Sequence, residues 1–285
     1  MIPASFEYAR AGSLREVLNA LAANDGTKLI AGGHSLIPML KFRLAQPPRL
    51  LDIAHIAELK GVSEYRRGAR IGAGTTYREL MESDTLRERF PLIGEVCRTI
   101  GDLQVRNRGT IGGAVAHADP ASDMPAVLIV LDALINVRSK RGKRAIEARD
   151  FFQGAFTTAL ADDELLTDIT VPPSPKGAGS AYASFAQAAS GYAIVAAAAI
   201  VARTRKTVNH VEVALTGLGD VAHRVESAQQ LVGTKAEPQA LDKVAAEAAT
   251  GIEIQGDIHA PAEYRRHLTA VAVRRALDAA LARAK

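Results

Sequence analysis

Hydrophobic positions in the first 170 residues form short runs that alternate with glycine-rich turns and helical patterns. Short apolar runs of this kind, bounded by turn residues, predict β-strands. They cover residues 28–30, 49–52, 69–72, 134–139 and 164–171. Between the first two strands, Leu36, Met39, Leu40 and Phe42 recur near helical spacing, so a helix should follow the turn after Ile30. The pattern indicates α/β structure.

Two helix starts can be predicted from capping residues. Thr76 and Glu79 have the spacing of a capping box, which predicts a helix from Thr76 through Glu82. Asp123 stands just before Met124 and Pro125, and proline is favoured in the first turn of a helix. We expect Asp123 to be the N-cap of that helix.

The chain changes character at a proline- and glycine-rich linker over residues 172–179. Beyond the linker, strand-like runs cover residues 182–188, 194–202 and 208–215, and helical patterns cover 227–231, 239–248 and 261–284. Three strands followed by helices predict a separate α+β domain. In the last helix we expect Leu268 and Ala272 on one side and arginines on the other.

Composition and charge narrow the class of protein. Hydrophobic residues make up 48% of the 285 residues, enough for a sizeable core, and the net charge is only +4. The basic run over residues 140–144 could be a nucleic-acid patch, but strand-like segments flank it and a solvated hairpin tip is favoured. We therefore expect no nucleic-acid partner.

The single cysteine, Cys97, excludes an internal disulfide and a cysteine-ligated iron–sulfur cluster within one chain. It stands in an apolar helical stretch and is expected to be a buried thiol. The most apolar segment, residues 192–202, is about half the length of a membrane span. Together with the absence of a secretory signal pattern at the N-terminus, this predicts a cytoplasmic protein that is not integral to a membrane.

Two glycine turns carry the candidate chemistry, one over residues 31–35 and one over 109–113. Paired glycines permit positive φ and let backbone N–H groups approach a ligand closely, which suits an anionic diphosphate. Neither turn has the Gly-x-Gly-x-x-Gly spacing of a dinucleotide fold or the Walker pattern. Taken alone, each turn is a weak signal, because double glycines occur more often in ordinary tight turns.

No catalytic or metal-binding set is evident. The seven histidines are scattered without the spacing of zinc ligands, and no Ser-His-Asp or Cys-His arrangement stands out. Asp119 and Asp123 are separated by Pro120, which argues against a paired acid and base on one helix face. His117 follows the second glycine turn and could hydrogen-bond to a ligand there, although a loop histidine is the favoured interpretation.

In their context the two turns resemble the FAD-binding subunits of the xanthine dehydrogenase family of molybdenum hydroxylases. The residues that carry the likeness are Ala31 to Pro38, then Arg108 to Gly113, then Asp119 to Asp123. Within the family, the likeness is strongest to the medium subunits of aerobic carbon monoxide dehydrogenases and runs nearly end to end. The resemblance implies an α+β fold: an FAD-binding domain of the vanillyl-alcohol-oxidase (PCMH) type with two α/β subdomains, and a C-terminal α+β domain with a three-stranded antiparallel sheet and helices. The implied boundaries are 1–177, with subdomains of about 1–54 and 55–177, and 178–285.

The resemblance also implies which residues bind the cofactor. The two loops would hold the FAD diphosphate, Asp123 its sugar part, and Tyr192 would stand beside the isoalloxazine ring, with Leu165, Leu166 and Ile169 on a strand lining the ring pocket. The full set of expected FAD-binding residues is Ala31, Gly32, Gly33, His34, Ser35, Leu36, Thr110, Ile111, Gly112, Gly113, Ala114, Asp123, Leu166, Ile169 and Tyr192. Valine at Gly32 or Gly112 is expected to abolish FAD binding and leave the chain folded.

Some positions depart from the family pattern. Ala114 and His117 stand where relatives often have asparagine, and residues 185–189 lack the lysine or arginine that relatives often carry near the flavin. Loss of a cation near the ring should disfavour the anionic reduced flavin.

The function implied by the resemblance is electron transfer. A small [2Fe-2S] subunit would deliver electrons to FAD in this chain, a large molybdopterin subunit would oxidise the substrate, and the complex would be a dimer of heterotrimers. Two alternatives stay open: a stand-alone FAD-dependent oxidoreductase, and a flavin-poor docking or assembly subunit. Neither the substrate nor the terminal electron acceptor follows from the sequence.

Overall fold

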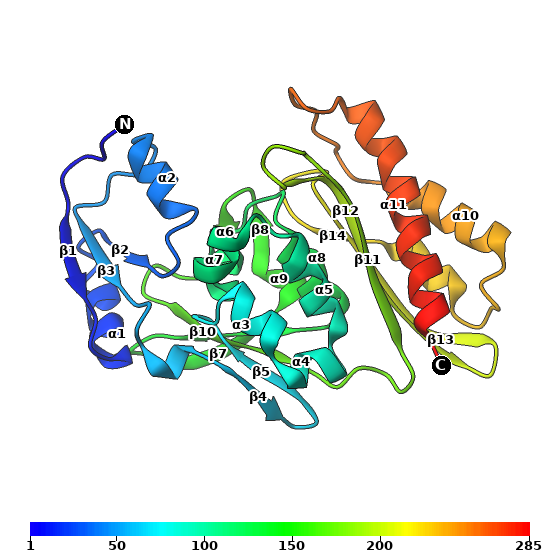
Figure 1. Cartoon of the computed structure of the whole chain (residues 1–285), viewed down its shortest axis with the longest axis horizontal. Coiled ribbons are helices and arrows are strands. Elements are labelled where there is room, and N and C mark those ends of the chain that lie inside the picture. Colours follow the sequence, from blue (N-terminus) through cyan, green and yellow to red (C-terminus); the bar gives the residue numbers. More distant parts are fainter.

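The computed structural model describes all residues, 1–285, and begins with a small three-layered lobe (Figure 1). Strands β1 (Glu7–Arg10), β3 (Arg49–Asp52) and β2 (Thr27–Ile30) form a parallel sheet in that order. Helix α1 (Leu14–Ala23) and helix α2 (Leu36–Lys41) complete the lobe, and the short 3-10 helix η1 (Ala57–Leu59) leads out of it. Because parallel strands need crossover connections, each strand is separated from the next by a helix.

The second part is built on a five-stranded antiparallel sheet with the order β4-β5-β10-β6-β7. Its strands are β4 (Val62–Tyr65), β5 (Gly68–Gly72), β6 (Leu134–Arg138), β7 (Lys143–Glu147) and β10 (Leu165–Val171). Between β5 and β6 the chain forms helices α3 (Tyr77–Glu82), α4 (Asp84–Arg89), α5 (Pro91–Thr99), α6 (Leu103–Arg108), α7 (Ile111–His117) and α8 (Asp123–Val130). Helix α9 (Ala148–Phe151) and the small hairpin β8 (Phe152–Gly154) and β9 (Thr157–Thr158) precede β10.

The last part is an antiparallel sheet of four strands covered on one side by helices. Its strands are β11 (Gly179–Ala186), β12 (Ala193–Thr204), β13 (Thr207–Thr216) and β14 (His223–Arg224), followed by the 3-10 helix η2 (Glu226–Leu231), helix α10 (Pro238–Glu247) and helix α11 (Ala262–Arg283). The prediction of three strands missed β14, whose two residues are too few to leave a hydrophobic pattern.

Strand β12 explains why the second half of the chain is rich in alanine. Ala198 and Ile200 face the larger core cluster, while Ala197, Ala199 and Val201 face the core beneath α10 and α11. A strand that is buried on both faces reads as a continuous apolar run. Small side chains let α8 approach on one side and α11 on the other.

Local signals were mostly correct, with one exception at α8. Thr76 forms the predicted capping box with Glu79, and the basic run lies at the tip of the β6–β7 hairpin, where Arg141 and Arg144 pair with Asp163 and Glu164. The N-cap of α8 is Ser122, so Asp123 is the first helical residue and not the cap that we expected. The Asp123 side chain instead accepts a hydrogen bond from a residue of another element, described below.

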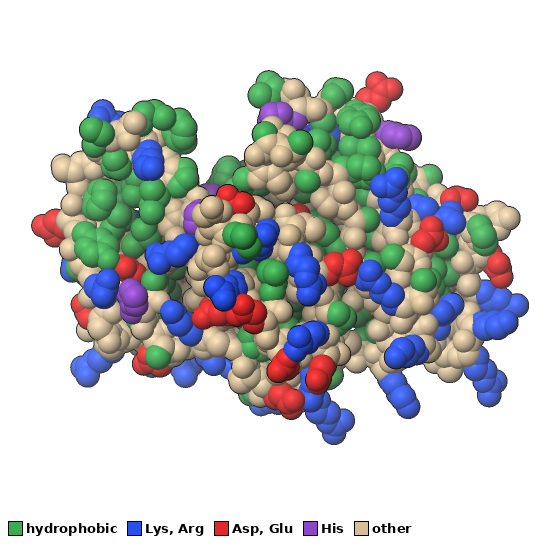
Figure 2. Space-filling view, viewed as in Figure 1, with side chains coloured by type: hydrophobic (Ala, Val, Ile, Leu, Met, Phe, Trp, Pro, Cys, Tyr) green, Lys and Arg blue, Asp and Glu red, His purple; other side chains and the backbone are tan.

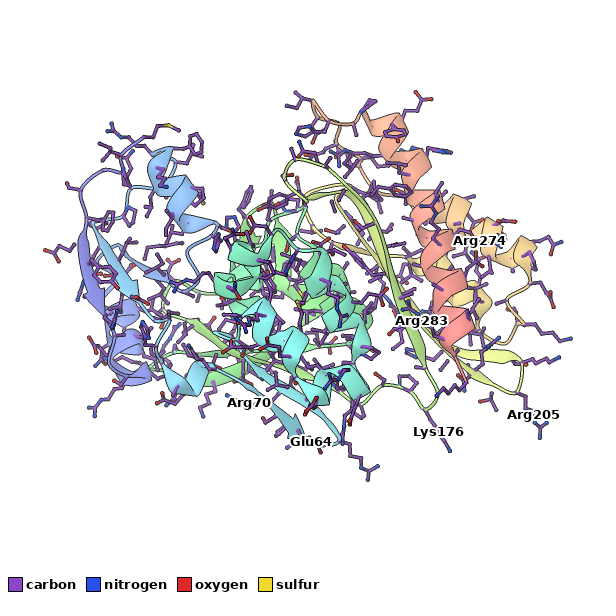
Figure 3. All side chains as sticks on the ribbon, viewed as in Figure 1. Glu64, Arg70, Lys176, Arg205, Arg274 and Arg283 are labelled. Carbon is purple, nitrogen blue, oxygen red and sulfur yellow. The ribbon has the colours of Figure 1, made fainter.

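An ion pair joins the last part of the chain to the helices of the second part. Arg283 of α11, labelled in Figure 3, donates to Glu95 of α5 at 2.7 Å. Cys97 is fully buried in α5, as expected. None of the helices combines the length and the apolarity needed to cross a membrane.

Candidate functional site

The loop between β2 and α2 presents an unusual run of free backbone donors. None of the six N–H groups from Ala31 to Leu36 donates a hydrogen bond to another part of the protein. Gly33 has a φ of +79°, a left-handed conformation that turns successive amides toward one side. Ser35 precedes α2 without capping it, so its hydroxyl is also available. Unpaired backbone donors in such a run can bind an anion, and residues 31–36 are called the nest below.

The two glycine loops touch each other. A Cβ atom placed on Gly32 would lie 2.2 Å from the backbone oxygen of Arg108, and one on Gly112 would lie 2.6 Å from the backbone oxygen of Ala73. Glycine is therefore required at both positions by close approach of backbone, and neither has positive φ. The expectation that valine at Gly32 or Gly112 would leave the chain folded is not supported, because either side chain would force packed backbone apart.

The second loop does not offer the free amides that the sequence suggested. Ile111 and Gly112 donate to the backbone oxygens of Thr75 and Ala73 at 3.0 and 2.8 Å. Gly113 donates to the hydroxyl oxygen of Thr110 at 3.1 Å, and Ala114 donates to the backbone oxygen of Thr110 at 3.1 Å. The loop is the capped first turn of α7, and what it presents outward is the exposed backbone of Gly113.

Asp123 is a buried carboxyl group at the start of α8. Its side chain accepts a hydrogen bond from the hydroxyl of Tyr182, which belongs to β11, and the residue is only 8% exposed. Burial, with a smaller contribution from the nearby charge of Asp119, raises the pKa of Asp123 to about 6 against the opposing effect of the Tyr182 hydrogen bond. The site therefore holds a carboxyl group that is close to titration at neutral pH.

Tyr192 stands at the open end of a tight turn between β11 and β12. The Gln187 N–H donates to the Tyr192 backbone oxygen at 2.9 Å, and Gly191, with a φ of +75°, donates back to Gln187 at 2.8 Å. The Tyr192 side chain is half exposed. Burial raises the pKa of its phenol, and the carboxylates of Asp119 and Asp123 add to that effect. The fold thus brings Tyr192 and Asp123, far apart in sequence, to the same region.

Other expected site residues are placed differently. Ile169 is 0% exposed and Leu166 4%, both in the core beneath α7 and α8, so neither side chain is free to contact a ligand. A β-bulge between Leu166 and Asp168 turns both toward this core, while Leu165 packs into the core of the first lobe. The expectation that these side chains line a ring pocket is not supported by their burial.

The two histidines near the loops differ in environment. His34 is exposed within the first loop. His117 ends α7, and its ring lies 5.0 Å from that of Phe156; burial lowers its pKa, so it is neutral at physiological pH. A neutral imidazole at this place can donate or accept a hydrogen bond but adds no positive charge.

Sequence patterns did not mark Tyr182, whose hydroxyl bonds to Asp123, or Arg265, whose guanidinium bonds to the backbone oxygen of Ile194. Tyr182 lies in a predicted strand, and nothing in that pattern marks the partner of its hydroxyl.

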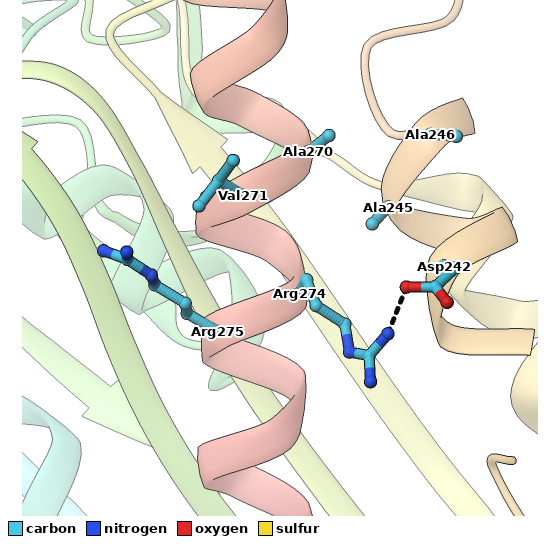
Figure 4. A pocket seen from close by; sticks show the side chains of 7 residues that line it. All are labelled: Asp242, Ala245, Ala246, Ala270, Val271, Arg274 and Arg275. Atoms are coloured by element: carbon cyan, nitrogen blue, oxygen red, sulfur yellow. Dashed lines mark hydrogen bonds and ion pairs between the residues drawn. The ribbon is translucent and has the colours of Figure 1, made fainter. Parts of the chain in front are cut away.

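The groove between α10 and α11 is a separate feature and holds an ion pair between Arg274 and Asp242 (Figure 4). It is lined by Asp242, Ala245, Ala246, Ala270, Val271, Arg274 and Arg275, none of which belongs to the loops described above. The molecular surface is also hollowed between the first lobe and the rest of the protein (Figure 2).

Comparison with known proteins assigns the class. Residues 4–174 match the family model of the FAD-binding domain in molybdopterin dehydrogenase, and residues 180–280 match that of the carbon monoxide dehydrogenase flavoprotein C-terminal domain. The chain therefore belongs to the FAD-binding subunits of molybdenum hydroxylases. It is of the medium-chain type found in carbon monoxide dehydrogenase.

Individual relatives support the assignment over the full length. The medium chain of carbon monoxide dehydrogenase from Hydrogenophaga pseudoflava is 38% identical, over 99% of both chains. The glyceraldehyde dehydrogenase medium chain of Sulfolobus acidocaldarius is 39% identical, over 95% of this chain and 96% of that one. A solved carbon monoxide dehydrogenase from H. pseudoflava superposes with a TM-score of 0.97 at 38% identity, covering all of both chains.

These findings confirm the predicted family, the α+β fold, FAD as the cofactor of the family and the oxidoreductase class. The relatives are medium subunits of multi-subunit complexes, as expected. Because their names specify different substrates, the likeness does not specify one for this chain.

Proposed function

We propose that this chain binds FAD and passes electrons from the iron–sulfur clusters of a small [2Fe-2S] subunit to an external acceptor. A large molybdopterin subunit would oxidise the substrate, and the complex would be a cytoplasmic dimer of heterotrimers. The observation that carries the proposal is the run of six unpaired amides from Ala31 to Leu36. Nothing in the chain satisfies these donors, and a diphosphate would.

The proposed site extends from the nest toward the C-terminal sheet. Residues 31–36 would bind the diphosphate, with Thr110 and Gly113 completing the cradle where the two loops meet. Asp123 would accept a hydrogen bond from the sugar part of FAD, and the ring of Tyr192 would lie against the isoalloxazine. Ile111, Gly112 and Ala114 would support the cradle through their bonds to Thr75, Ala73 and Thr110. Leu166 and Ile169 would contribute only to the hydrophobic core under the site, without contacting FAD.

The proposed division of the chain follows its cores. Residues 1–177 would form the FAD-binding domain, with subdomains of about 1–54 and 55–177, and residues 178–285 the C-terminal domain. Supporting this, the core of 24 buried residues beneath α10 and α11 draws only on residues beyond Gly179, and a small core of seven buried residues lies mainly in the first lobe. The larger core of 34 buried residues belongs to the second subdomain and also takes in Ala198, Ile200 and Ala214 of the C-terminal sheet.

Bound FAD accepts electrons one at a time and releases them in pairs, which suits a station between clusters and a two-electron acceptor. The chain itself contributes binding, orientation and exclusion of water. Its one cysteine, whose pKa burial raises to about 12, is a protonated thiol and unsuited to hold a cluster.

The purified full-length chain should bind one FAD and bind FMN far more weakly. FMN lacks the second phosphate and the adenosine, so at least two charge-assisted hydrogen bonds of about 1.5–3 kcal/mol each would be lost. The expected difference in dissociation constant is about 100-fold or more. Equilibrium titration followed by flavin fluorescence measures both ligands. Equal affinity for FMN and FAD would contradict a diphosphate site, and no binding of either, in the chain and in its complex, would favour a docking subunit.

Elemental analysis should separate the roles of the subunits. The isolated chain should contain neither iron nor molybdenum, and the complex purified by a tag on this chain should contain both. The physical reason is the lack of cluster ligands in this chain, where no group of three or more metal-binding side chains occurs. Stoichiometric iron in the isolated chain would contradict the proposed division of labour.

A further inference from the structure

Arg265 of α11 is a buried arginine on a helix whose other arginines are partly or fully exposed. It is 6% exposed, and its guanidinium donates to the backbone oxygens of Ile194 and Gly217 at 2.5 Å each and to the Asp257 carboxylate at 2.6 Å. Burying a charged group is costly unless every donor is paired. The three acceptors come from three different segments, so the side chain acts as a fixed junction among them.

Two of these contacts control the turn that carries Tyr192. Ile194 lies two residues after Tyr192, at the start of β12, so the Arg265 bond fixes where the chain leaves the turn. Asp257 also accepts hydrogen bonds from the backbone N–H groups of His259 and Ala260 at 2.8 and 2.9 Å.

The entry to the same turn is held from the segment that Asp257 organises. The His259 ring lies 3.3 Å from the side-chain nitrogen of Gln187, and the Gln187 backbone N–H donates to the Tyr192 oxygen. One guanidinium therefore restrains the Tyr192 turn at both ends.

The remaining contact of Arg265, with the backbone oxygen of Gly217, connects it to the segment just before Asp123. The N–H of Gly217 donates to the backbone oxygen of Pro120 at 3.0 Å. The neighbouring Thr216 hydroxyl lies 2.8 Å from the backbone oxygen of Ser122, the residue before Asp123. Gly217 has a φ of +84°, and a Cβ there would lie 2.7 Å from the Ile194 oxygen, so the two strand ends held by Arg265 are tightly packed.

We propose that Arg265 is a positioning residue that sets the placement of Tyr192 relative to Asp123, and hence relative to the flavin. The inference rests on the proposed function, because both residues are assigned there to the FAD site. Arg265 itself is almost completely buried and is not among the residues assigned to the FAD site. It acts from behind the sheet, where α11 packs against β11 and β12 (Figure 1).

The test compares Arg265→Lys with Arg203→Lys in the FAD-loaded full-length chain or its complex. Arg203 is a matched control, because its guanidinium also donates to two backbone oxygens, of Leu281 and Ala284, but at the far end of α11. Lysine keeps the charge and loses the fork that reaches three segments. A tyrosine ring against a flavin quenches its fluorescence, so we expect Arg265→Lys to increase the emission of bound FAD and to weaken FAD binding about ten-fold, the equivalent of one lost hydrogen bond.

A double variant separates positioning from general stability. With Tyr192→Leu the quenching ring is absent, so adding Arg265→Lys should raise the emission no further, which is the non-additivity expected of residues acting in series. If Arg265→Lys does not fold, Asp257→Asn removes the carboxylate charge that pairs with Arg265 and leaves its bonds to Ile194 and Gly217 in place, so it should raise the emission by a smaller amount. Unchanged emission in a destabilised Arg265→Lys chain, or an equal increase from Arg203→Lys, would overturn the proposal. Failure of the wild-type chain to bind FAD would instead contradict the proposed function.

Discussion

Replacing Gly33 with alanine should weaken FAD binding by about 100-fold or more while leaving the protein folded. Gly33 has a φ of +79°, which costs a residue with a Cβ about 1 kcal/mol. A Cβ would also lie 2.8 Å from the Cδ1 atom of Ile37, a flexible contact that can yield. If the backbone relaxes to negative φ, the amides no longer converge, and losing two bonds to a charged diphosphate costs about 3–6 kcal/mol.

A matched control is available in the same lobe. Gly26 has a φ of +78°, and a Cβ there would meet only Pro48, at 3.1 Å. Gly26→Ala should therefore lower the melting temperature as much as Gly33→Ala does and leave the FAD dissociation constant unchanged. Flavin titration and thermal unfolding of both variants measure the two effects. Full FAD affinity in a folded Gly33→Ala chain would show that the diphosphate binds elsewhere.

Replacing Asp123 with asparagine should stabilise the FAD-free protein at pH 8. Burial raises the pKa of Asp123 from 3.8 to about 6, so between these values the folded chain holds more protons than the unfolded chain. The free energy of unfolding therefore falls as the pH rises through this window, by about 3 kcal/mol in all. Asparagine keeps an acceptor for the Tyr182 hydroxyl and removes the buried charge, so the variant should recover most of that loss.

The same variant should bind FAD more weakly, because a neutral amide is a poorer acceptor for a sugar hydroxyl than a carboxylate. Gain of stability with loss of binding is the pattern expected of a residue kept for function. Denaturant unfolding from pH 4 to pH 8 should show a flatter profile for Asp123→Asn than for wild type. Tyr182→Phe supplies the contrast: it removes the bond that favours the ionised carboxylate, so its stability at pH 8 should fall. A lower stability of Asp123→Asn at every pH would refute the argument.

The sequence was most reliable where a signal is local. The Thr76 capping box depends on residues three apart, and the run from Lys28 through Ser35 placed a strand, a tight turn and a helix start in the right order. The glycines were expected to let backbone approach a ligand, and at Gly32 and Gly112 it is neighbouring protein backbone that requires the missing side chain. Their chemistry could not be read, because whether an amide is free depends on what lies opposite it: Ala73 and Thr75 satisfy Ile111 and Gly112, while nothing satisfies residues 31–36.

Predictions from local sequence patterns failed where partners from elsewhere in the fold decide the placement of a side chain. Arginines were expected on the outer side of the last helix, yet Arg265 is buried, because the backbone oxygens of the distant residues Ile194 and Gly217 and the nearby Asp257 carboxylate pair its guanidinium. Asp123 was expected to cap α8 and instead bonds to Tyr182. The β-bulge between Leu166 and Asp168 likewise breaks the alternation of β10, so that Leu166 and Ile169 face the same core.

The sequence by itself therefore determined the family, the order of the elements and the cofactor class, since these follow from residue types and short spacings. Only the tertiary structure decided how the second loop is satisfied, that Asp123 is a buried carboxyl group with a raised pKa, and that Arg265 joins the segments bearing Tyr192 and Asp123. Hydrogen bonding and desolvation in a folded protein depend on groups brought together from far along the chain, and no local pattern encodes them.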